Sequence, residues 1–81
     1  MTEVELINIS VIADSLAGTQ EYRVEYREKE TGFVGRIMVS FEDVDDKGLD
    51  TILIEEMEKI EPLLKSLKEL QKKYVGKTIS I

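Results

Sequence analysis

The sequence predicts an α+β fold in which a mainly antiparallel sheet of three or four strands packs against one long helix. Two observations support this fold class. Apolar and polar residues alternate through much of the first half of the chain, which is typical of strands, and apolar residues recur every three or four positions from Leu49 onward, which is typical of a helix. At 81 residues the chain makes a single domain, residues 1–81, with the element order β-β-β-α-β.

The first strand is expected at residues 3–13, where its pattern is irregular. Val4 and Leu6 share one face, whereas the alternate apolar residues from Ile7 to Ala13 fall on the other face. This change of phase predicts a bulge between Leu6 and Ile7, or burial of the strand on both faces.

The second and third strands are expected at residues 20–28 and 33–42. In residues 21–27, which read EYRVEYR, tyrosine and valine alternate with charged residues. The third strand repeats this alternation, with Phe33 and Phe41 on the same face. Each strand therefore has one apolar face for a core.

Two lengths of loop between these strands keep the apolar faces matched. A four-residue loop pairs Glu25 with Arg36, whereas a two-residue loop places Arg27 opposite Arg36. Like charges directly across a ladder oppose pairing, so the four-residue loop is favoured. It also pairs Tyr26 with Gly35, where the ring covers the bare backbone of the glycine.

The helix is expected at residues 49–75. Pro62 lies inside it, so the pattern predicts either one kinked helix or two abutting helices with Pro62 in the first turn of the second. Lys72 and Lys73 suit the last turn and Gly76 suits a C-terminal cap. The last five residues, which read KTISI, predict a short strand at residues 77–81.

Composition excludes several kinds of site. The chain has no cysteine and no histidine, so it has no disulfide, no zinc site built on these residues and no histidine base. No serine lies in a nucleophile-elbow motif. We therefore expect no enzyme and no cofactor. The acidic N-terminal segment does not resemble a signal peptide, and no apolar run is long enough for a membrane span, so a cytoplasmic protein is expected.

An acidic run before the helix resembles a calcium-binding loop. Asp43, Asp45 and Gly48 match three positions of the EF-hand pattern, but Lys47 and Ile54 stand where ligands are required. We therefore expect no metal site. The run is interpreted as a strand-to-helix turn in which Gly48 provides conformational freedom and Asp46 or Asp50 caps the helix.

Charge is unevenly distributed along the chain. Residues 42–61 hold nine acidic and two basic residues, and residues 62–81 hold one acidic and five basic residues. The lysines of the second group have neither arginine nor aromatic residues beside them, so direct nucleic-acid binding is disfavoured. Acids near the start of a helix and lysines near its end also complement the helix dipole.

The predicted helix is longer than the sheet beneath it. Residues 49–75 span about 40 Å as a helix, whereas the third strand spans about 30 Å. The apolar residues at the end of the helix therefore need another surface. If two copies paired with their helices antiparallel, the acidic half of each would lie along the basic half of the other, which favours a homodimer.

Two hypotheses for function follow. The first is a non-catalytic protein-interaction or assembly module that self-associates through its long helix; short acidic chains of this kind are typical of accessory proteins, including those of phages and mobile elements. The second is an acidic inhibitor that occupies the basic groove of a protein that handles DNA or RNA. The candidate partner-binding residues are Leu63, Leu67, Leu70 and Tyr74 for the first hypothesis, and Asp43, Asp45, Asp46 and Asp50 for the second.

Overall fold

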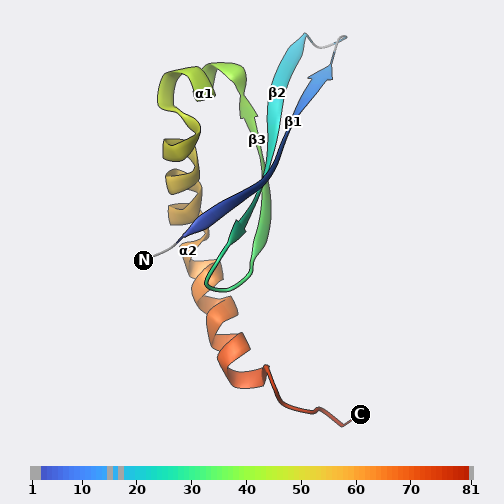
Figure 1. Ribbon diagram of the computed structural model, residues 1–81, viewed down its shortest axis with the longest axis vertical. Helices are drawn as coiled ribbons and strands as arrows, with labels where there is room; N and C mark the ends of the chain where they lie inside the picture. The colour runs from blue at the N-terminus through green and yellow to red at the C-terminus, as the bar shows by residue number, and fades with distance from the viewer. Residues whose placement is uncertain (1–2, 15, 17, 81) are drawn as a thin grey trace.

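A computed structural model describes residues 3–14, 16 and 18–80, and within them three strands precede two helices (Figure 1). The strands β1 (Val4–Asp14), β2 (Thr19–Glu28) and β3 (Val34–Ser40) form one antiparallel sheet in the order β1-β2-β3. The helix α1 (Phe41–Lys47) leads into α2 (Leu49–Tyr74), which lies along one face of the sheet. The predicted α+β class is confirmed.

The register of β2 with β3 is the one that charge pairing favours. Glu25 lies opposite Arg36 and Tyr26 lies opposite Gly35. The ring of Tyr26 lies against the backbone of Gly35 so closely that a β-carbon at this position would overlap it. Glycine is therefore required here by its lack of a side chain, and the predicted cover of the glycine by the tyrosine is confirmed.

β1 contains the predicted bulge. Its pairing with β2 shifts between Leu6, which lies opposite Tyr26, and Asn8, which lies opposite Glu25. Ile7 is the extra residue on the bulged strand. Beyond the bulge, Ile9 lies opposite Val24, so the side chains that share the apolar face of β2 are Val4, Leu6, Ile9 and Val11.

The core is small and lies between α2 and the strands β2 and β3. Its buried apolar residues are Val24, Tyr26, Val39, Leu53 and Leu64. At the far end of β2, the rings of Tyr22 and Phe41 stack with centroids 4.3 Å apart. This contact fixes the point where β3 ends and the chain turns back toward the sheet.

The acidic run after β3 is a helix, so the predicted turn and the predicted extension of the third strand to residue 42 are wrong. Ser40 caps α1, because its hydroxyl accepts a hydrogen bond from the Asp43 backbone N–H at 3.1 Å. Gly48, with φ of 81°, ends α1 and precedes α2, which has no side-chain cap. Neither Asp46 nor Asp50 caps a helix as expected.

α2 is one helix that runs through Pro62, rather than two abutting helices. Proline has no N–H, so the hydrogen bond expected to the carbonyl of Glu58 is missing. The side chain of Pro62 is exposed, on the side of the helix away from the core. At the C-terminal end, Lys72 and Lys73 occupy the last turn and Gly76 adopts a φ of 88°, as expected for a helix stop.

The predicted strand at residues 77–81 does not form in its described part, residues 77–80, and Ile81 lies outside the described residues. The physical reason is position. In Figure 1 the orange and red end of α2 continues past the β2–β3 turn, so the tail leaves the helix beyond the sheet. No strand edge lies there for the tail to pair with.

Candidate interaction surfaces

A row of exposed apolar side chains lies on the C-terminal half of α2. Its members are Leu63, Leu67, Leu70 and Tyr74, and we call it the C-terminal row. Leu67 is half-buried, whereas the other three side chains are between 46% and 55% exposed. These are the four residues that helical spacing predicted for this role, and the fold places them on one side of the helix.

The C-terminal row is exposed because the sheet ends before the helix does. The β2–β3 turn lies beside Gln71, whose side-chain amide donates a hydrogen bond of 2.7 Å to the backbone carbonyl of Thr31. Tyr74 lies nearly one helical turn beyond this contact. The mismatch of length predicted from the sequence is therefore present.

Glu28 anchors the β2–β3 turn from inside the protein. Its side chain is only 1% exposed, although it carries a carboxylate. The carboxylate accepts hydrogen bonds of 2.8 Å from the backbone N–H groups of Glu30 and Thr31, and another from the Thr31 hydroxyl. Burial raises the pKa of Glu28, but these hydrogen bonds and the charge of Lys68 lower it further, so the net pKa lies below its usual value.

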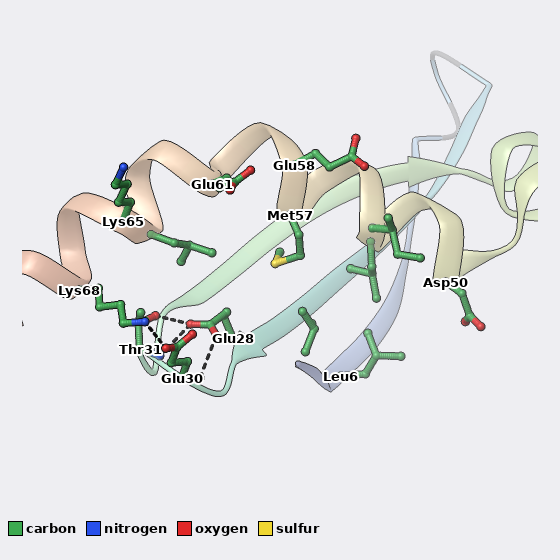
Figure 2. A pocket seen from close by; sticks show the side chains of 14 residues that line it. Leu6, Glu28, Glu30, Thr31, Asp50, Met57, Glu58, Glu61, Lys65 and Lys68 are labelled. Carbon is green, nitrogen blue, oxygen red and sulfur yellow. Dashed lines mark hydrogen bonds and ion pairs between the residues drawn. The ribbon is translucent and has the colours of Figure 1, made fainter. Parts of the chain in front are cut away.

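Two further contacts tie this turn to α2. Lys68 forms an ion pair with Glu30, and Gln71 forms the hydrogen bond to Thr31 (Figure 2). The ion pair with Glu30 raises the pKa of the Lys68 ammonium group. Sequence reasoning missed this arrangement. Its one signal was Gln71, the polar residue that interrupts the apolar stripe of the helix.

An open trough runs between β1 and α2, with a volume of about 710 Å³. Figure 2 shows Met57 pointing from the helix toward the strands and Leu6 on the β1 side. We call it the β1–α2 trough. Its apolar lining residues are Val4, Leu6, Leu53, Ile54, Met57 and Leu64. The sequence alone gave no indication of this trough.

The charged residues that line the trough are segregated along α2. Asp50, Glu58 and Glu61 come from its first half, and Lys65 and Lys68 come from its second half. The wall of the trough therefore changes from negative to positive along the helix. The segregation of charge in the sequence thus continues along the side of the helix that borders the open trough.

The helix-side face of β1 is largely uncovered. The side chains of Leu6, Ile9 and Val11 are between 44% and 59% exposed, although they lie on the same face of the sheet as the buried Val24. α2 packs over β2 and β3, so nothing in the described part of the chain covers this side of β1 completely. Contiguous exposed apolar surface of this kind marks interaction sites.

The four candidate aspartates lie at the other end of the molecule from the C-terminal row. Asp43, Asp45 and Asp46 project from α1, and Asp50 lies in the first turn of α2; all four side chains are exposed. None of them forms an ion pair within the described residues. The nearby Lys47 pairs instead with Glu55, with 3.4 Å between the charged atoms.

The described ranges 3–14, 16 and 18–80 contain no cluster of three acidic side chains arranged to hold a metal ion. Neither of the two helices in those ranges combines the length and the apolar character that a membrane crossing requires. In comparisons with known proteins, no family model, no curated protein and no solved structure matches this chain.

Proposed function

We propose that this chain is a non-catalytic assembly module that self-associates through the C-terminal row of α2. The observation that carries the proposal is the exposure of that row beyond the end of the sheet. Three large apolar side chains left in water on one side of a helix are a cost to a free monomer. A second copy of the same surface, brought by a two-fold axis, would bury all of them.

The dimensions of the chain support association. A compact protein of 9.3 kDa exposes about 5,000 Å², whereas this chain exposes 6395 Å². Its radius of gyration is 16.2 Å, against about 12 Å for a compact domain of this length. The tail after α2 accounts for part of the excess of about 1,400 Å², and a standard interface buries about 800 Å² on each partner.

Charge also suits an antiparallel meeting of two α2 helices. Residues 42–61 carry a net charge of −7 and residues 62–81 carry a net charge of +4. When two C-terminal rows pack antiparallel, the basic end of each helix lies toward the acidic middle of the other. Such complementarity favours the correct orientation and speeds encounter.

The test replaces Leu70 with lysine and measures molar mass by light scattering across a range of concentrations. Leu70→Lys should weaken association through the C-terminal row by about 100-fold or more, because association would bury an unpaired charge. The matched control is Val34→Lys, which changes an apolar residue of similar exposure on the opposite face of the sheet. Equal association of wild type and Leu70→Lys would contradict the role of the row.

The second candidate function is an acidic inhibitor, which the exposed and unpaired aspartates of α1 favour. Replacing Asp43, Asp45 and Asp46 with lysine separates the two candidates. An inhibitor should lose a basic partner and should bind it with a steep salt dependence before the change. An assembly module should keep its self-association. Asp50 is left unchanged in this test because it also lines the β1–α2 trough.

A further inference from the structure

β1 is an unprotected edge of the sheet. It is 11 residues long and lies at one end of the order β1-β2-β3, so one side of its backbone has no strand beside it in the described residues. Proteins usually guard such edges with lysine, proline or a covering segment. β1 reads VELINISVIAD, with no lysine and no proline, and its only irregularity is the bulge near one end.

The other edge of the sheet differs. β3 is only seven residues long, carries Arg36, and continues directly into α1, which turns over the sheet. A long apolar edge and a short, charged edge in the same sheet indicate that only one of them is kept open for pairing. The exposed face of β1 beside the β1–α2 trough points to the same side of the molecule.

We propose that β1 pairs antiparallel with β1 of a second copy of this chain, which joins two sheets into one sheet of six strands. Antiparallel pairing about a two-fold axis perpendicular to the sheet keeps both α2 helices on the same face. The row of Leu6, Ile9 and Val11 in each copy then lies beside the same row of its partner. The two β1–α2 troughs become one groove with a helix along each wall.

A second copy fits this surface better than an unrelated strand because of the charges that line the trough. The two-fold axis runs the two α2 helices in opposite directions. Asp50, Glu58 and Glu61 of one copy therefore face the half of the partner helix that carries the partner's Lys65 and the partner's Lys68. An extended peptide from another protein would pair with the β1 backbone but would bring no such wall. This inference concerns a surface separate from the C-terminal row and does not depend on that row.

Backbone hydrogen exchange tests the pairing directly. In an edge strand, alternate amides bond to the neighbouring strand and the others point outward. At high protein concentration the outward amides of β1 should exchange slowly, and dilution should restore fast exchange while the inward amides keep their protection. The outward amides of β3 provide the internal control, since they should exchange fast at every concentration.

The result that overturns the proposal is fast exchange of the outward β1 amides in a sample that light scattering shows to be associated. Slow exchange that does not change with concentration also overturns it, because another molecule or another segment of the same chain would then cover β1. A strictly monomeric protein overturns both this proposal and the proposed function.

Substitutions separate the two surfaces. Ile9→Lys, on the trough side of β1, should raise the dissociation constant of the β1 contact by about 100-fold or more, because pairing would bury an unpaired ammonium group. Ile12→Lys is the matched control, because it changes the same strand on the opposite face, opposite Glu21. Circular dichroism checks that each variant folds. An Ile9→Lys protein that associates like the control contradicts the proposal.

The mass of each variant distinguishes failure here from failure of the proposed function. If both surfaces operate, the wild type forms species larger than a dimer, Ile9→Lys and Leu70→Lys each leave a dimer, and the double variant is a monomer of 9.3 kDa. If only β1 operates, Leu70→Lys changes nothing and Ile9→Lys alone gives the monomer. The reverse result would leave the C-terminal row as the only contact and contradict the pairing of β1.

Discussion

Glu28 is the residue whose chemistry departs most from its surroundings. It continues the apolar face of β2 after Val24 and Tyr26, yet it is a buried acid. Burying a carboxylate is costly unless hydrogen bonds replace its water. Here the N–H groups of the β2–β3 turn and the Thr31 hydroxyl supply them. The turn and the carboxylate therefore hold each other in place.

We expect Glu28→Gln to lower the free energy of unfolding by about 1–3 kcal/mol at pH 7, because the amide group presents donors to donors. The pKa of Glu28 lies below its usual value of 4.5 in the folded chain, so ionised Glu28 stabilises the fold above that pH. The difference between wild type and variant should therefore shrink as the pH falls from 4.5 through the lowered pKa.

Urea unfolding measured between pH 7 and pH 3 checks this expectation. Glu69→Gln is the control, because Glu69 is an exposed acid on α2. A difference between Glu28→Gln and wild type that stays constant down to pH 3 would mean that the carboxylate charge does not contribute.

Residues that act through local pairing were the most predictable from sequence. The cover of Gly35 by Tyr26 followed from strand alternation and from the charges of Glu25 and Arg36, which all lie within one hairpin. The burial of Glu28 was not predictable in this way. A charged residue at the end of a strand normally reaches solvent, and only the fold of the turn shows that its hydrogen bonds are satisfied internally.

Among the elements, α2 was predicted closely because its apolar spacing continues over many turns, and Pro62 did not interrupt that spacing. α1 was missed because it is only seven residues long and has no buried side chain, so no hydrophobic period marks it. Its cap, Ser40, also continues the alternation of β3. A short helix of this kind is stabilised by its cap and by Phe41, whose ring stacks on Tyr22.

We expect Pro62→Ala to raise the free energy of unfolding by about 1–3 kcal/mol, because alanine restores the missing hydrogen bond within α2 and fits a helix better. Denaturant unfolding of the wild type and the variant measures the change. Ser66→Ala, at an exposed position one turn later, should change stability by no more than about 0.5 kcal/mol. A loss of stability in Pro62→Ala would indicate that proline sets a bend needed for packing Leu64.

At the scale of the whole molecule, the C-terminal row was predictable because it depends only on the lengths of a helix and a strand. The β1–α2 trough was not, because it depends on which strands the helix covers. The alternation in β1 shows that one face is apolar, but it does not show that α2 packs over β2 and β3 and leaves β1 open. Lateral placement of a helix on a sheet is a tertiary property.

We expect the thermal unfolding midpoint to rise with protein concentration, because association stabilises the folded state by mass action. For a domain of this size the rise should be about 3–6 °C for each tenfold increase in concentration. Calorimetry over a hundredfold range measures it. The double variant with lysine at positions 9 and 70 should show a constant midpoint. A constant midpoint in the wild type would indicate a chain that folds as a monomer.

The ties between the β2–β3 turn and the end of α2 also set an order of events during folding. A hairpin joins residues that are close in sequence and forms in about 1–10 μs. Gln71 and Thr31 lie 40 positions apart in the chain, so their contact requires the closure of a long segment. We therefore expect the sheet to form early and the end of α2 to dock last. The C-terminal row lies on this late segment, so a chain would expose β1 to a second copy before its own helix is in place.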